Sequence, residues 1–172
     1  FRRVLFRSIP SAEQMRMWDS YTITYEPVSS IDLMERAAAR CVEKITETYP
    51  TEFRFSIFCG SGNNGGDGLA MARMLAEKGY SVSVFRCATG GGLSSDNSIN
   101  FDRLMQRGDV PVTEIQSQHD FPNWKDHQDI IIDALFGTGM NRPAEGVSAA
   151  LIDHMNALGM PIIAIDMPSG LY

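Results

Sequence analysis

Three polar, glycine-rich segments follow apolar runs in this chain and carry residue types that could do chemistry. They read CGSGNNGGDG at 59–68, DALFGTGMNRP at 133–143 and DMPSG at 166–170. Asp133 and Asp166 each close an apolar run, where desolvation and neighbouring charges can shift the pKa of a carboxyl group. Oxygens of Asn64, Asp133 and Ser169 could surround a hard cation. If the segments meet, they predict one site with acid–base groups and oxygen ligands.

Two of the segments also carry groups suited to phosphate. Residues 137–143 supply backbone N–H groups, the Thr138 hydroxyl and the Arg142 guanidinium. Residues 60–65 fit the G-x-G-x-x-G pattern of dinucleotide-binding turns. About 20 residues further on, however, stands Arg86 where that pattern expects an acidic residue. Arg86 could face a 2′-phosphate, so an NADP-dependent oxidoreductase remains an alternative.

Each of these features also has a purely structural interpretation. Residues 60–68 could form an ordinary Asn/Gly turn with Asp67 as the N-cap of the next helix. Asp133 and Asp166 could each cap the following loop or helix through backbone N–H groups. Residues 137–143 could be a flexible loop with an exposed Arg142. The sequence leaves these interpretations open.

The elements that must position the three segments follow a strand–helix alternation. Helical spacing and capping residues predict two N-terminal helices, from Ser11 to about Tyr25 and from Ser29 or Ser30 to Pro50. Strands are predicted at 53–59, 81–86, 110–115, 130–132 and 161–165, and helices at 69–78, 95–107 and 145–158. This order predicts a three-layer αβα Rossmann-like sandwich with a mainly parallel sheet, preceded by two helices. In such a fold, ligands bind at the carboxyl ends of the strands.

Composition excludes several classes of protein. The 172 residues carry a formal net charge of −6, which argues against nucleic acid as a general partner. No apolar run reaches the roughly 18–20 residues of a membrane span. The three cysteines show no CxxC spacing, so we expect reduced thiols and a cytoplasmic protein. Residues 1–8 lack the apolar stretch of a signal peptide and are expected to be a non-native or disordered leader.

The sequence resembles the YjeF N-terminal domain family, the NAD(P)H-hydrate (NAD(P)HX) epimerases. The resemblance covers residues 9–172 and rests on LMERAAAR, GSGNNGGDGLAMARML, DALFGTGMNRP and IDMPSGL, which occur in the family's order. It implies a domain that ends before the family's usual C-terminal elements. It also implies an isomerase that interconverts the R and S hydrates of NADH and NADPH (NADHX and NADPHX), with potassium (K⁺) as cofactor and a homodimer as the assembly. The partner that it implies is an ADP- or ATP-dependent dehydratase, fused or separate. Neither nucleic acid nor a membrane is expected as a partner.

The resemblance also implies a role for particular residues. Asp166 would contact the reacting ring as the catalytic acid or base, and Asn64, Asp133 and Ser169 would hold K⁺. The hydrate would be bound by Asn63, Asn64, Gly65, Gly66, Asp67, Gly137, Thr138, Gly139, Met140, Asn141, Arg142, Pro143 and Asp166. The alternative is a non-catalytic module that binds nucleotide derivatives or serves as a scaffold, since domains of this family also occur in such roles.

Overall fold

In the part of the chain that the structure describes, five parallel strands form one sheet at the centre of the molecule. The computed structural model describes residues 10–88, 92–123, 129–140 and 142–171. The strands are β1 (Arg54–Cys59), β2 (Ser81–Cys87), β3 (Val112–Ile115), β4 (Asp129–Ala134) and β5 (Ile162–Ala164). Their order is β3-β2-β1-β4-β5, and all four neighbouring pairs are parallel. The strand ends differ from the predicted ones by only one or two residues.

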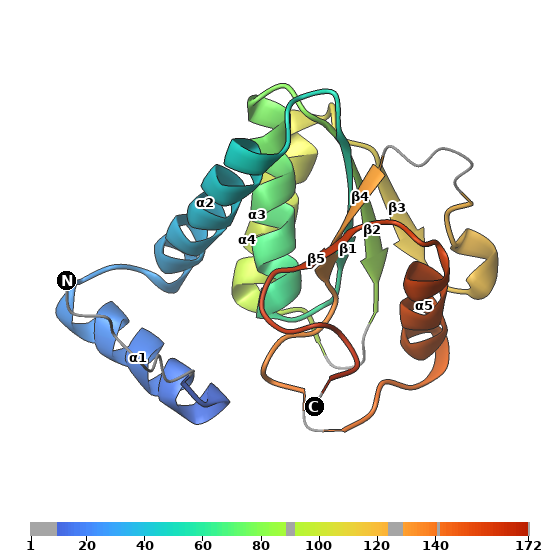
Figure 1. Ribbon diagram of the computed structural model, residues 1–172. Coiled ribbons are helices and arrows are strands. Elements are labelled where there is room, and N and C mark those ends of the chain that lie inside the picture. The colour runs from blue at the N-terminus through green and yellow to red at the C-terminus, as the bar shows by residue number, and fades with distance from the viewer. Residues whose placement is uncertain (1–9, 89–91, 124–128, 141, 172) are drawn as a thin grey trace, which may run out of the picture.

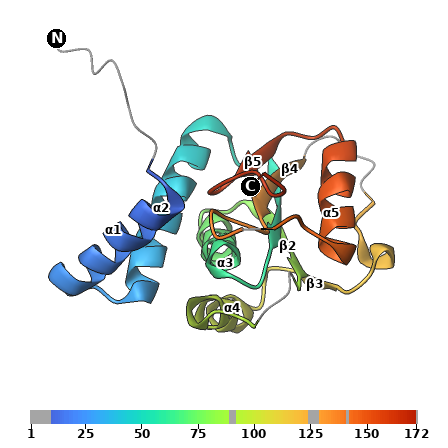
Figure 2. The ribbon, with the colours of Figure 1, turned by 90° about the horizontal axis from the view of Figure 1, so that it is seen from below.

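Helices cover both faces of this sheet (Figures 1 and 2). The helices α2 (Ser30–Thr48), α3 (Asn63–Glu77) and α4 (Ser95–Arg107) lie on one side, and α5 (Gly146–Ala157) lies on the other. A short 3₁₀ helix, η1 (Gln118–Asp120), follows β3. The predicted three-layer αβα sandwich with two preceding helices is confirmed.

The helix ends follow from local side-chain and backbone chemistry. The Ser11 side chain caps α1 (Ala12–Tyr25) in the predicted capping box with Gln14, and Ser29 caps α2. Gly79, Gly108 and Gly159 adopt φ values of 86°, 75° and 67° just past three helices. A residue with a side chain is strained in this left-handed conformation, which is why glycine stands at the end of these helices.

The prediction was wrong about the start of α3, which begins at Asn63 instead of residue 69. Asp67 is therefore inside the helix, and the N-cap is Gly62. The glycines of this first stretch are required by close packing: a Cβ at Gly65 would lie 1.9 Å from the Gly60 carbonyl oxygen. Tertiary packing overrides the weak helix propensity of NNGGDG.

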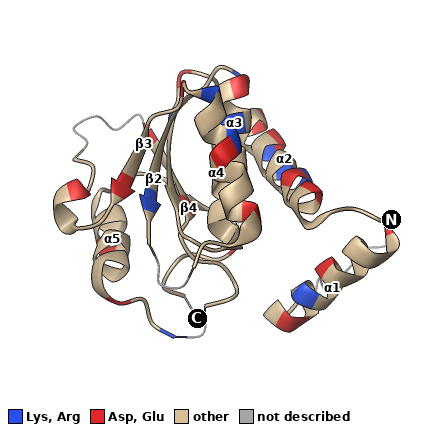
Figure 3. Cartoon of the chain, turned by 180° about the vertical axis from the view of Figure 1, so that it is seen from behind, with Lys and Arg blue, Asp and Glu red and all other residues tan. Residues whose placement is uncertain are grey.

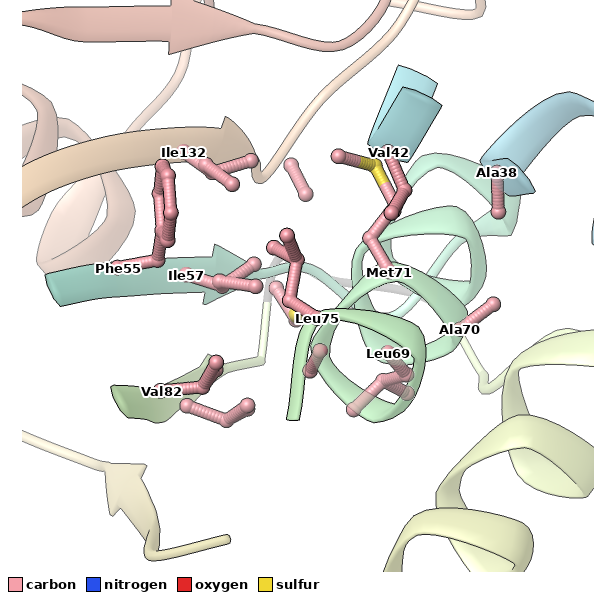
Figure 4. Close-up of a cluster of buried hydrophobic side chains, with 14 of the residues drawn as sticks. Ala38, Val42, Phe55, Ile57, Leu69, Ala70, Met71, Leu75, Val82 and Ile132 are labelled. Atoms are coloured by element: carbon pink, nitrogen blue, oxygen red, sulfur yellow. The ribbon is translucent and has the colours of Figure 1, made fainter. Parts of the chain in front are cut away.

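The core is continuous on both faces of β1 and β4. On one face Phe55, Ile57 and Ile132 pack with Leu75 of α3 (Figure 4). On the other face Phe58 and Ile131 pack with the buried Leu151 of α5. Burial on both faces explains why these strands are apolar without alternation.

The first helix contributes little to this core. None of the residues of α1 is buried, and Trp18, Tyr21 and Tyr25 are 62%, 60% and 68% exposed. The helix stands apart from the sheet and approaches the rest of the molecule next to α2 (Figure 1). In the described part of the chain, no helix combines the length and apolar character that crossing a membrane requires.

The substitution Gly68→Ala tests the close packing of α3 on the sheet. A Cβ at Gly68 would lie 2.6 Å from the Ala134 Cβ and 2.9 Å from the Cys59 Sγ, which are both buried. We expect this variant to lose about 1–3 kcal/mol of unfolding free energy in urea titrations. The expected sign is opposite to that of helix propensity, which favours Ala over Gly by about 1 kcal/mol. The matched control is Gly62→Ala, where no atom lies within 4 Å of the added Cβ; equal stability of the two variants would contradict the packing argument.

Candidate active site

The three polar segments come together because the strands before them are neighbours in the sheet. β4 lies between β1 and β5, with Cys59 in register with Ala134 and Asp133 in register with Ala164. The Gly60 amide donates to the Ala134 carbonyl oxygen (3.0 Å), and the Ile165 amide donates to the Asp133 carbonyl oxygen (3.1 Å). The loops after β1, β4 and β5 therefore leave the same edge of the sheet side by side.

Asp133 connects two of these loops. Its side chain is only 4% exposed, and its carboxylate accepts hydrogen bonds from the amides of Leu135 (3.2 Å) and Ser169 (2.8 Å). The Ser169 hydroxyl also donates to it at 2.6 Å. The structural interpretation of Asp133 as a cap for backbone N–H groups is thus correct. A buried carboxylate held by several donors fixes the loops that supply them.

The third loop joins the same network through Asn64. The Asn64 side-chain amide donates to the Phe136 carbonyl oxygen at 2.6 Å, and the Phe136 amide donates to the Ser169 hydroxyl at 3.0 Å. Asn64, Ser169 and Asp133, the proposed metal ligands, are therefore linked by successive hydrogen bonds. The Asn64 Oδ1 atom is buried and has no hydrogen-bond partner among the described residues.

Asp166 lies exposed where β5 meets its loop and is tied to the loop after β4. Its carboxylate accepts a hydrogen bond from the Thr138 amide at 2.7 Å. A Cβ at Gly137 would lie 2.6 Å from the Asp166 Oδ2 atom, so glycine is needed for this approach. Asp166 thus also accepts a hydrogen bond from a backbone N–H group, as the structural interpretation expects, and it remains open to solvent.

Asp67 has an unusual titration behaviour that the sequence did not reveal. It is half-buried on α3, and burial is the main cause that raises its pKa from 3.8 to about 7. The negative charges of Asp166, Asp19 and Asp96 raise this pKa further. The Asp67 carboxyl is consequently divided between its acid and base forms near neutral pH.

A cleft of about 1030 Å³ opens above these loops. Its walls come from α1, α2, the start of α3 and the segment between β4 and α5. The predicted binding residues that line it are Asn63, Asn64, Asp67, Gly137, Thr138, Gly139, Met140, Arg142, Pro143 and Asp166. Gly65 and Gly66 do not line the cleft. They are buried where α3 packs against the Gly60 carbonyl and the Met34 side chain. Asn141 lies outside the described residues.

Arg86 does not take part in this cleft. Its guanidinium is 2.6 Å from the Glu114 carboxylate, and it lies 3.7 Å from the ring centroid of Phe101. The alternative in which Arg86 faces a 2′-phosphate is therefore not supported, because its charge is already paired.

Sequence reasoning missed the support that α4 gives to the loop after β1. The Asn97 side chain is fully buried and donates to the carbonyl oxygens of Gly60 (3.0 Å) and Gly62 (2.9 Å). The available signal was the presence of Asp96, Asn97 and Asn100 where an amphipathic helix would place apolar residues. Buried amides at such positions indicate a specific backbone partner.

The fold and the cleft define an α/β protein of the Rossmann-like class, with a polar site at the carboxyl ends of parallel strands. Residues 30–172 match the family described as "YjeF-related protein N-terminus", and the chain belongs to this family.

Proteins similar to this chain carry related names. A protein of Limosilactobacillus fermentum named "NAD(P)H-hydrate epimerase" is 37% identical over 161 residues, which is 94% of this chain and 74% of that protein. A Moorella thermoacetica protein named "Bifunctional NAD(P)H-hydrate repair enzyme Nnr" is 34% identical over 94% of this chain and 31% of its own length. The crystal structure of yeast ynu0, YNL200c, has the same fold, with a TM-score of 0.81, 21% identity and coverage of 95% and 72% of the two chains.

The raised pKa of Asp67 makes a prediction about stability. Unfolded Asp67 ionises near pH 4, whereas the folded protein keeps it protonated up to about pH 7. The contribution of Asp67 to the free energy of unfolding should therefore become less favourable as the pH rises from about 4 to about 7. Asp67→Asn removes this penalty. From pH 5 to pH 8 the free energy of unfolding of this variant should rise by on the order of 1–2 kcal/mol relative to that of the wild type.

Melting curves of the two proteins at pH 5 and pH 8 check this expectation. Asp153→Asn is the control, because Asp153 is an exposed acid on α5, away from the cleft. If the melting difference between Asp67→Asn and the wild type stayed constant over this pH range, Asp67 would have an ordinary pKa.

Proposed function

We propose that this chain interconverts the R and S epimers of hydrated NADH and NADPH, a repair reaction on damaged nicotinamide cofactors. The observation that carries the proposal is the pair of carboxyl groups, Asp67 and Asp166, in a large cleft beside two glycine-rich loops. The names of the relatives support it, since they are called NAD(P)H-hydrate epimerases at 33–37% identity.

The reaction requires proton transfer at oxygen. Inverting C6 of the hydrated ring requires its hydroxyl group to leave and return on the other face, or the ring to open and close. In the first route a carboxylic acid gives its proton to the departing hydroxyl, and water leaves while the ring nitrogen shares its electron pair with C6. Water then adds to the opposite face and returns a proton to the carboxylate. Such acid–base catalysis contributes typically 10²–10⁴-fold.

Asp166 is the residue we assign to this proton transfer. It is exposed in the cleft, and the Thr138 amide holds its carboxylate in place. Burial is the main cause that raises the pKa of Asp67 to about 7, and the negative charge of Asp166 adds to it, so Asp67 can hold a proton beside the reacting ring. A carboxyl group that keeps its proton near neutral pH, beside a second carboxyl group that is open to solvent, suits a reaction that transfers protons at oxygen.

The donor set below the cleft fits a potassium ion. The buried Asn64 Oδ1 has no partner in the described part of the chain, and Asp133 is a buried carboxylate with no cationic side chain paired to it there. The Ser169 hydroxyl provides a third oxygen. We propose that these three residues hold K⁺, which would supply positive charge to a buried carboxylate and stabilise the Pro168–Gly170 turn.

The proposal extends to the protein's partners and location. An ADP- or ATP-dependent dehydratase, fused or separate, would consume the S epimer, as the name of the bifunctional relatives suggests. We also propose a homodimer, for which the exposed aromatic residues of α1 offer apolar surface, and a cytoplasmic location. A scaffold module would not need two carboxyl groups in the cleft, so the enzyme is the better-supported function.

Replacing Asp166 tests the assignment of the acid–base group. Asp166→Asn keeps the size of the side chain and should lower the epimerisation rate about 10²–10⁴-fold. The rate is measured by chromatography of a resolved R hydrate as the S form appears. Asp102→Asn, at an exposed acid on α4, should leave the rate unchanged. Full activity of Asp166→Asn would assign the proton transfer to another group.

Exchange of the cation tests the potassium site without an activity assay. The melting temperature should be higher in potassium chloride than in tetramethylammonium chloride of equal concentration, because an ion that binds only the folded state stabilises it. At 100 times its Kd the ion would add about 2.7 kcal/mol. Ser169→Ala should reduce the difference between the two salts. Identical melting in both salts for the wild type would remove the ion from this account.

A further inference from the structure

Two arginines in the described part of the chain have no carboxylate partner, and both line the cleft. Arg16 lies on α1, and Arg142 lies between β4 and α5. Every other arginine in the described ranges forms an ion pair; these are Arg36, Arg40, Arg54, Arg73, Arg86, Arg103 and Arg107. Unpaired guanidinium groups gathered at one cleft indicate an anionic ligand.

The position of Arg16 is not explained by packing within the chain. Ala12, Met15, Arg16 and Asp19 line the cleft, and their spacing places them on one face of α1. Since α1 has no buried residue, this face does not serve the core. Both signs of charge occur on α1 (Figure 3), but no carboxylate of the described residues lies within 4 Å of the Arg16 guanidinium.

The same cleft contains a second feature suited to an anion. Helix α3 begins at Asn63, its N-cap Gly62 has no side chain to cap it, and its first turn has no acidic residue. Its first N–H groups are therefore available to a ligand, and no atom lies within 4 Å of a Cβ built at Gly62. The cleft also contains three acids, Asp19 on α1, Asp67 on α3 and Asp166 after β5. Burial and the charges of its acidic neighbours raise the pKa of Asp67. The uncapped helix start and the two arginines thus offer positive potential beside an acidic region.

We propose that Arg16 is a substrate-binding residue, and that with Arg142 it binds phosphate oxygens of the ADP half of the hydrated dinucleotide. This inference rests on the proposed function for the identity of the ligand. This inference gives α1 a role, because the helix forms one wall of the binding cleft and supplies the Arg16 guanidinium. The neutral hydrated ring would then lie toward Asp67 and Asp166, and the phosphates toward the arginines.

Calorimetric titration with ADP-ribose tests the inference, because this probe has the diphosphate but no nicotinamide ring. Arg16→Gln and Arg142→Gln should each raise the Kd about tenfold, and Arg16→Lys should raise it less. Lys78→Gln is the matched control: Lys78 is an exposed cation without an ion-pair partner among the described residues, and it lies outside the cleft. Its Kd should stay within twofold of the wild type.

A second titration, with 2′-phospho-ADP-ribose, shows which phosphate Arg16 contacts. A larger loss of affinity in Arg16→Gln for this ligand than for ADP-ribose assigns the contact to the 2′-phosphate. Equal losses of affinity assign it to the diphosphate.

The outcomes separate this inference from the proposed function. If Arg16→Gln binds both probes as tightly as the wild type, or if the wild type binds ADP-ribose no better than adenosine, the inference is overturned. Circular dichroism of each variant checks that α1 and the sheet remain folded. A wild type that binds ADP-ribose through Arg16 but does not epimerise the hydrate would overturn the proposed function and leave the phosphate contact in place.

Discussion

The burial of one carboxylate, Asp133, is the constraint on which the arrangement of the site depends. A buried anion is costly unless hydrogen bonds compensate for the lost water. Here the compensation comes from Leu135 in its own loop and from the amide and hydroxyl of Ser169 in the loop after β5. The Ser169 hydroxyl also accepts a hydrogen bond from the Phe136 amide, and the Phe136 carbonyl oxygen accepts one from the Asn64 side chain. Satisfying one charge therefore fixes three loops.

The site also lowers stability in ways that its function would explain. Burial, together with the negative charges of neighbouring acids, raises the pKa of Asp67 to about 7. The start of α3 uses glycines, because Gly65 and Gly68 touch the loop and the strands too closely for a side chain. Glycines in a helix cost about 1 kcal/mol each relative to alanine. The low helix propensity of these glycines is the cost of packing α3 this closely, and the buried Asp67 carboxyl is a second cost, which selection for a functional cleft would explain.

The sequence predicted most of the fold because apolar runs and helix caps are local signals. The five strands could be located from periodicity, and the end of α4 from Gly108. The start of α3 could not, because NNGGDG has the composition of a turn and becomes helical only when packed on Ala134 and Cys59. For the site, the carboxyl-end rule for parallel strands brought Asn64, Asp133 and Ser169 together. The raised pKa of Asp67, the clamp from Asn97 and the presence of Arg16 at the cleft depend on elements far apart in the sequence, and no local pattern reports them.

Hydrogen exchange of the backbone amides in Ser169→Ala tests the central claim most directly, because this change removes one hydroxyl from the shared network. If Asp133 and Ser169 hold the three loops together, exchange should become faster at once in residues 60–67, 135–140 and 166–171, while the amides of β1 and β2 keep their protection. Faster exchange confined to residues 166–171 would show that the loops are held independently, and the account would be wrong.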